Sequence, residues 1–248
     1  MRSGRLAHLL ALIGLGGAGG CAAVAPGPGV AVTAGVTSDQ WTVRWDPVLR
    51  TPTLMTNQSL QDQAGFGRGQ AISDSAAEAA ARGVFRDRAD WFRMRPGVDD
   101  LLFYRSQSKG WLRALKFVQT YAGVPVMGAG YEVTVLPNGR VGSIEGRLVP
   151  DLHIDVRPSL SMQQASDIAR AQYAAGAAEP TDAARLYFEN EPGAGVPGFL
   201  ALVSQGDQFV LAWGVVATGN PRSLARIYVD ANHAAVLGSQ LLGYQDPR

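Results

Sequence analysis

Apolar and polar residues alternate with a period of two along a stretch in the middle of the chain, residues 115–121. This period is typical of a β-strand with one buried face. That face is expected to hold Leu115, Phe117, Gln119 and Tyr121. A second alternating stretch, 131–135, leads into Asn138-Gly139, a dipeptide that favours a tight turn between paired strands. We therefore predict an antiparallel meander over 113–149.

Two other stretches have the spacing of an amphipathic helix. Ser75 and Glu78 form a capping-box pattern, which predicts the start of a first helix that ends near Arg88. Ser161 and Gln164 form the same pattern and predict the start of a second helix.

The rest of the chain is divided by turn-forming residues into short segments. A stretch rich in Thr, Asn, Gln, Gly and Arg predicts a loop over about 50–72. Further strands are expected at 41–45, 101–104, 185–188, 199–203, 208–216, 224–229 and 236–237. One helix followed by an antiparallel sheet thus occurs twice, which predicts an α+β fold rather than a parallel α/β fold.

The first 20 residues have a different pattern, which indicates a signal peptide. Arg2 and Arg5 precede a short apolar run over 6–15, and small residues follow up to the single cysteine, Cys21. The run is too short to cross a bilayer, which needs about 20 apolar residues. A single cysteine also excludes an intramolecular disulfide.

Ala18-Gly19-Gly20-Cys21 resembles a bacterial lipobox, although Ala18 stands where Leu is usual. The resemblance implies a signal peptide over 1–20, a lipid on Cys21 and a flexible tether over 21–40. The chain would then be attached to the cell envelope at the outer membrane or cell surface. Two alternatives stay open. In the first, cleavage after Ala25 gives a secreted or periplasmic protein. In the second, Cys21 is a thiol that stands there by chance and carries no lipid.

Charge and motif content exclude several classes of function. The chain has 22 basic and 21 acidic residues, without the basic surplus of a nucleic-acid-binding domain. A zinc protease needs two histidines four residues apart with a glutamate between them, whereas the chain holds only His8, His153 and His233. It also lacks the Gly-x-Ser-x-Gly motif of a serine hydrolase. We therefore expect no enzyme activity, no catalytic or metal-binding residues and no cofactor.

The stretch from Leu115 to Leu152 resembles the propeptide region of fungalysin- and thermolysin-type metalloproteases (FTP), running into a PepSY-type segment. The residues that carry this resemblance are Phe117, Gln119, Tyr121, Gly123, Pro125, Gly128, Gly139 and Pro150. The resemblance implies that these eight positions have structural roles. It extends to both flanks, through 45–52 on one side and 227–231 on the other.

The resemblance also implies a domain organisation. An FTP-like subdomain is expected over 41–152 and a PepSY-like subdomain over 153–248, each a helix on an antiparallel sheet of cystatin-like type. The chain departs from the family at His233-Ala234, where a Thr-Gly turn is usual. Since alanine disfavours positive φ, we expect a change in the last hairpin.

In the resembled family, the pro-segment helps its protease to fold and inhibits it until it is removed. The first hypothesis is therefore a non-catalytic lipoprotein that inhibits or chaperones the catalytic domain of a secreted thermolysin-like protease, with the tail 240–248 as a candidate for its cleft. A second is a PepSY-type envelope module for another peptide or protein partner. A third is the front fragment of an interrupted protease precursor. The membrane would be contacted only through the lipid, and no nucleic acid is expected.

Overall fold

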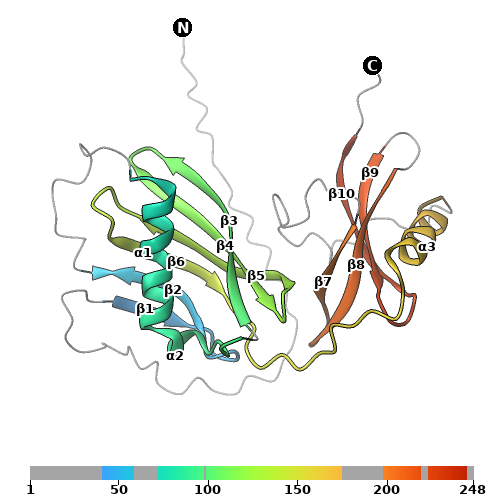
Figure 1. Cartoon of the computed structure of the whole chain (residues 1–248), viewed down its shortest axis with the longest axis horizontal. Helices are drawn as coiled ribbons and strands as arrows, with labels where there is room; N and C mark the ends of the chain where they lie inside the picture. Colours follow the sequence, from blue (N-terminus) through green and yellow to red (C-terminus); the bar gives the residue numbers. More distant parts are fainter. Residues whose placement is uncertain (1–40, 59–71, 98, 175–197, 219–222, 245–248) are drawn as a thin grey trace, which may run out of the picture. The chain divides into compact units, whose positions relative to one another are not determined.

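The computed structural model describes residues 41–58, 72–97, 99–174, 198–218 and 223–244. These residues belong to one compact unit with a mixed α+β fold, in which antiparallel strands outnumber the helices (Figure 1). The signal segment, Cys21, the tether and the strand expected at 185–188 lie outside the described residues. In the described part, no helix is long and apolar enough to cross a membrane.

Six strands form an antiparallel sheet in the first half of the chain. They are β1 (Trp41–Trp45), β2 (Pro52–Asn57), β3 (Asp99–Lys109), β4 (Leu112–Tyr121), β5 (Val124–Val135) and β6 (Val141–Arg147). Hydrogen bonding joins them in the order β3-β4-β5-β6-β2-β1. The meander predicted over 113–149 is confirmed as β4-β5-β6, and Gly139 donates to the Leu136 carbonyl at 2.9 Å in the β5–β6 turn.

The prediction of a loop over 50–72 is wrong for residues 52–57, which form β2. Pro, Thr and Asn in this stretch favour turns, so the local sequence gives little strand signal. Pairing with β6 decides the outcome, because Met55 lies opposite Ile144 and both are 0% exposed. Burial against a strand far along the chain outweighs the weak local preference.

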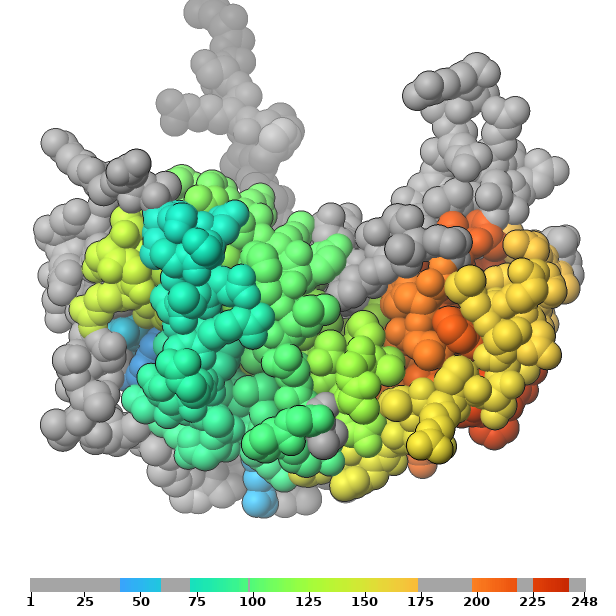
Figure 2. Space-filling view, in the orientation of Figure 1, coloured from blue at the N-terminus to red at the C-terminus, as the bar shows by residue number. Residues whose placement is uncertain are grey.

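Two helices, α1 (Asp74–Asp87) and the short α2 (Ala89–Phe92), cover one face of this sheet (Figures 1 and 2). The aromatic core between helices and sheet is built edge to face, an arrangement that aromatic rings favour. Phe85 of α1 lies 5.3 Å from the ring of Phe117 on β4 and 5.1 Å from that of Phe92. The predicted end of the first helix near Arg88 is confirmed.

The predicted start of α1 is wrong in the residue that caps the helix. Ser73 is the N-cap, and its side chain accepts the backbone N–H of Ala76 at 3.3 Å. Ser75 lies inside the first turn, and Glu78 pairs with Arg82 at 2.8 Å instead of closing a capping box. Two serines stand next to the helix start, and only the geometry of the chain entering the helix selects between them.

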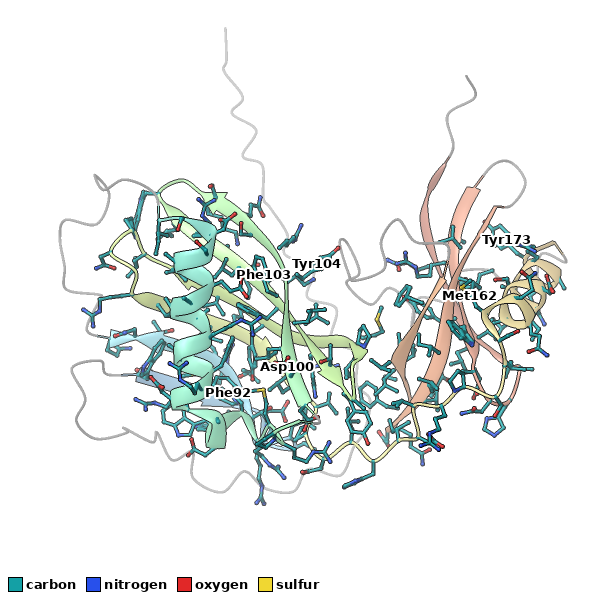
Figure 3. The ribbon with its side chains drawn as sticks, viewed as in Figure 1. Phe92, Asp100, Phe103, Tyr104, Met162 and Tyr173 are labelled. Atoms are coloured by element: carbon teal, nitrogen blue, oxygen red, sulfur yellow. The ribbon has the colours of Figure 1, made fainter. Side chains whose placement is uncertain are left out.

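Four strands follow in the second half, each antiparallel to the next: β7 (Gly198–Gln205), β8 (Gln208–Thr218), β9 (Ser223–Asp230) and β10 (Val236–Tyr244). The three strands predicted at 199–203, 208–216 and 224–229 are confirmed, and the last strand is longer than predicted. The helix α3 (Met162–Ala174) packs on β8 and β9; Figure 3 labels Met162 and Tyr173 on it. Its buried contacts come from Ala165 and Ala169.

The capping box predicted for the second helix is confirmed. Ser161 donates its backbone N–H to the side chain of Gln164 at 2.9 Å, and the backbone N–H of Gln164 donates to the Ser161 hydroxyl at 3.3 Å. Both partners lie within one turn of the chain, so the sequence pattern and the structure agree.

β5 takes part in both sets of strands. Along β4, Val118 pairs with Gly130 while Thr120 pairs with Pro125, so residues 126–129 of β5 leave the β4 register. Val126, within this bulged segment, pairs in parallel with Leu202 of β7. The expected boundary between two subdomains near residue 152 stays a prediction.

Candidate functional site

Two of the sequence-predicted motif residues lie inside the core. Phe117 is 0% exposed and packs below α1. Gln119 is buried too, and its side-chain amide donates to the Val149 carbonyl at 2.8 Å and accepts the Val149 N–H at 2.8 Å. An amide side chain thus makes the pair of hydrogen bonds that a neighbouring strand would make. Glutamine at this position satisfies backbone groups that would otherwise be buried without partners.

Tyr121 ends β4 and contacts the same exit segment. Its hydroxyl accepts the backbone N–H of Ile154 at 3.2 Å, and the guanidinium of Arg95 lies 5.4 Å from its ring centroid. Arg95 donates to the Asp99 carboxylate at 2.7 Å, and this hydrogen bond raises the pKa of Arg95 above its ordinary value. Pro150 lies half-buried directly after Val149. Gln119 and Tyr121 therefore hold the chain where it leaves β6.

The remaining motif residues shape β5. Gly123 lies in the β4–β5 turn with φ of 80°, Gly128 lies in the bulged segment with φ of 73°, and Gly139 lies in the β5–β6 turn with φ of 81°. Pro125 pairs with Thr120 at the start of β5. Only a residue without Cβ takes such φ values at low cost. These residues set the turns and the bulge.

Gly130, which the family motif does not single out, is the most constrained of these positions. It has φ of 147°, and a Cβ there would lie 2.1 Å from the carbonyl oxygen of Phe117. The backbones of β4 and β5 therefore approach each other more closely than any side chain permits. The sequence signal that could have found it is the repeated glycine spacing 128, 130 within a strand, which favours a bulge.

A pocket of about 270 Å³ opens beside this bulge, and it is lined by backbone or side-chain atoms of four neighbouring strands. Its lining includes Arg105, Lys116, Val118, Ala129, Glu132 and Glu145. The side chains of Phe117 and Tyr131 point into the core under α1, so alternation puts those of Lys116 and Glu132 on the opposite face, away from α1. We call this pocket the open-face pocket.

A row of charged residues crosses the strands at this pocket. The register pairs Arg105 of β3 with Lys116 of β4, Lys116 with Glu132 of β5, and Glu132 with Glu145 of β6. The two cations are therefore neighbours on one side, and the two carboxylates are neighbours on the other. Like charges directly opposite each other on paired strands are destabilising. The central Lys116–Glu132 neighbours have opposite charge and attract, whereas the outer pairs, Arg105–Lys116 and Glu132–Glu145, have like charge and repel. This order gives the open face a positive side and a negative side.

Part of this row is already neutralised within the chain. Lys109 forms an ion pair with Glu132, which neutralises that carboxylate. Arg147, beside the row, donates to the neutral Gly128 carbonyl at 3.2 Å. Within the described part of the chain, Arg105, Lys116 and Glu145 make no ion pair or side-chain hydrogen bond. Spacing along the chain did not predict this group of residues, because register alone brings them together.

His153 and His233 are both exposed. The described residues contain no group of three or more His, Cys, Asp or Glu placed to hold a metal ion. His233 contacts Asp230 at 3.1 Å in the β9–β10 turn. Burial opposes ionisation of Asp230, but the N–H groups of Asn232 and His233 and the His233 ring together hold its pKa below the ordinary value. Ala234 has φ of 60°, so the turn keeps a left-handed residue despite the loss of glycine.

Comparison with known families places the resemblance on the central strands. Residues 108–148 match the family model described as the fungalysin/thermolysin propeptide motif. The expected propeptide-like region is confirmed for these residues, which include β4, β5 and β6 and the pocket residues Lys116, Glu132 and Glu145. No curated protein matches the chain.

Two solved structures are similar to the chain at low sequence identity. The C-terminal domain of YpeB from Bacillus megaterium is 14% identical, with 84% of each chain covered and a TM-score of 0.41. A protein from Clostridium difficile 630, provisionally described as a lipoprotein, is 14% identical over 73% of this chain and 97% of its own, with a TM-score of 0.22.

Proposed function

We propose that this chain is a non-catalytic envelope lipoprotein that binds the catalytic domain of a secreted thermolysin-like metalloprotease, as its inhibitor or folding chaperone. The observation that carries the proposal is the match of residues 108–148 to the fungalysin/thermolysin propeptide motif. The proposal includes two tandem cystatin-like subdomains, FTP-like over 41–152 and PepSY-like over 153–248. It also keeps structural roles for the eight motif residues.

The physical basis of such a function is differential binding. A protein that binds the native protease but not its unfolded chain stabilises the native state by mass action, by about 2.7 kcal/mol when its concentration is 100 times the dissociation constant. The same protein inhibits when its bound position excludes substrate from the cleft. Neither effect requires a catalytic group in the binder. Both require a preformed surface, which a sheet with its core packed under α1 provides.

Titration against thermolysin tests this proposal directly. A lipid-free form that starts at residue 22 is mixed with the active enzyme while cleavage of a short peptide substrate is followed. Separately, it is mixed with denatured enzyme while recovery of activity is followed. We expect saturable inhibition, or a higher refolding yield, at micromolar concentration or below. A serine protease serves as the control that excludes simple competition as a substrate. Absence of both effects at micromolar concentration would refute the proposal.

A second candidate is a PepSY-type envelope module for another peptide or protein partner. The observation that favours it is the open-face pocket, where Arg105, Lys116 and Glu145 have no side-chain partner among the described residues, since such a pocket can bind any partner of complementary charge and shape. Affinity capture from the native envelope separates the two candidates. Recovery of a metalloprotease supports the first, and reproducible recovery of a different protein with the protease absent supports the second.

Attachment through Cys21 is the part of the proposal that concerns location. Replacing the thiol by a hydroxyl removes the acceptor of the lipid, so Cys21→Ser should move the protein from the membrane fraction to the soluble fraction. Labelling with a radioactive fatty acid should mark the natural protein and not the variant. An unlabelled natural protein would instead support cleavage after Ala25 and secretion.

A further inference from the structure

We propose that the open-face pocket is an anchoring site for an acidic side chain of the partner protein, whose carboxylate binds between Arg105 and Lys116. The inference rests on the proposed function in one respect only, namely that the partner is the protease catalytic domain. The pocket itself, with its order of charges, is independent of the partner's identity. The chemistry it recognises is a carboxylate carried on a flexible apolar stem.

The first argument is the unsatisfied positive charge. Arg105 and Lys116 are directly paired across β3 and β4, whose backbones lie about 4.8 Å apart in a regular sheet. Both side chains are half-buried, and within the described residues neither has an ion-pair or hydrogen-bond partner. Two neighbouring cations that have lost part of their hydration are destabilised both by repulsion and by desolvation. A carboxylate placed between them would relieve both effects.

The second argument is the balance of charge around the pocket. The carboxylate of Glu132 already pairs with Lys109 from the end of β3. Arg147 adds a further cation beside Gly128 at the rim. The pocket lining has two cations and two carboxylates, and Lys109 and Arg147 add two cations around it. The field there therefore favours an anionic group over a cationic one.

The third argument is the apolar surface that adjoins the cations. Leu102 of β3 lies opposite Val118 of β4 and is 46% exposed, one of the few large apolar side chains in the described part that is exposed. Val118 and Ala129, both buried, line the pocket beside Lys116. An acidic side chain entering here would rest its methylene groups on Val118 and Ala129, and a neighbouring apolar residue of the partner would cover Leu102. Apolar contact next to a desolvated charge pair is the usual composition of an interface anchor.

The negative side of the row gives the bound segment a direction. Glu132 lies on the strand next to Lys116, and Glu145 lies two strands from Lys116, about 10 Å at the spacing of a regular sheet. A basic residue of the partner at that distance from its acidic residue would meet Glu145, which is exposed and unpaired in the described part. A segment with the opposite order of charges would meet repulsion at both ends, so the row selects orientation as well as affinity.

The pocket can be tested without any protease. Nuclear magnetic resonance titration uses N-acetylglutamate α-amide as the probe and its neutral isostere N-acetylglutamine α-amide as the control. We expect saturable shifts of backbone amides around Lys116 and Ala129 with the acidic probe, weak binding in the millimolar range, and no saturable shifts with the neutral probe. The double variant Arg105→Gln/Lys116→Gln should lose the response. Equal responses to both probes, or a response that survives in the double variant, would overturn the inference.

A matched variant controls for changes in total charge. Arg86 lies on α1 with its side chain 78% exposed, away from the open face, so Arg86→Gln should bind the acidic probe as the natural protein does. The double variant should keep its urea midpoint or raise it, since it removes repulsion between neighbouring cations. A large fall in the midpoint would mean that the two cations are needed for folding, which contradicts the argument from unsatisfied charge.

The protease measurement then separates this inference from the proposed function. If the natural protein binds thermolysin, the double variant should bind at least roughly tenfold more weakly and Arg86→Gln equally well. Tight binding by the double variant would overturn the inference and leave the proposed function intact. If the natural protein does not bind, the proposed function fails and the resonance titration alone decides on the pocket. Sedimentation of the free protein covers a third outcome: a dimer abolished by the double variant would identify a second copy of the chain as the occupant, contrary to our proposal.

Discussion

Adding one methyl group at Gly130 should strongly destabilise the protein. A Cβ on residue 130 would lie 2.1 Å from the Phe117 carbonyl oxygen and 3.0 Å from the Val118 Cα, so the β4 and β5 backbones would have to separate. Overpacking of this kind costs about 1–3 kcal/mol, and a non-glycine residue held at φ of 147° adds about 1–3 kcal/mol. We expect Gly130→Ala to lose about 3 kcal/mol, a large part of the roughly 5–15 kcal/mol that stabilises a typical domain.

Urea denaturation followed by tryptophan fluorescence measures this loss. With a slope near 2 kcal/mol per molar urea, the midpoint should fall by about 1.5 M. Gly142→Ala on neighbouring β6 is the matched control: its φ is not positive and the nearest atom to its Cβ, the Thr134 oxygen, is 3.7 Å away. The control should change stability by no more than about 0.5 kcal/mol. Equal midpoints for the two variants would refute the close approach of β4 and β5.

Three further changes test other parts of the fold by urea denaturation. Gln119→Leu should cost about 2–4 kcal/mol, because it leaves the N–H and carbonyl of Val149 buried without partners; a cost below about 1 kcal/mol would contradict the reciprocal pairing. Ser73→Ala should lower the free energy of unfolding by about 1 kcal/mol and Ser75→Ala should hardly change it. The opposite result would show that Ser75 caps the helix, as the sequence predicted. The folded-state pKa of Asp230 lies below the ordinary 3.8, so its charge stabilises the fold above that pH and the contribution is lost as pH falls through the lower folded value. The stability difference between the natural protein and Asp230→Asn should therefore shrink on going from pH 7 to pH 3, and a constant difference would exclude the charge as its cause.

Local patterns predicted the elements whose hydrogen-bond partners are close in sequence. The Ser161–Gln164 capping box and the turn at Asn138-Gly139 both form as predicted, since each is completed within a few residues. The alternation over 115–121 predicted the burial of Leu115, Phe117 and Gln119 on one face, but Val118 and Thr120 on the other face are buried too. The resemblance to the fungalysin/thermolysin propeptide motif could also be seen in the amino-acid sequence alone, because it is a matter of residue types and their spacing.

Long-range pairing decided what these patterns left open. β2 forms because Met55 meets Ile144, although its own sequence favours turns. Within the bulge at 126–129, Val126 pairs with Leu202 of β7 and not with β4. Neither partner can be identified from local period, since both depend on register between segments far apart in the chain.

The open-face pocket shows the same division most clearly. The amino-acid sequence was enough to predict the α+β order of elements, the meander turn, the capping of α3 and a glycine-rich motif that resembles a protease pro-segment. Only the tertiary structure shows that four charged residues form one row across four strands beside a pocket: Arg105, Lys116, Glu132 and Glu145. The physical reason is that alternation assigns a side chain to a face, whereas its neighbours on that face are set by the register of strands that the chain brings together from a distance.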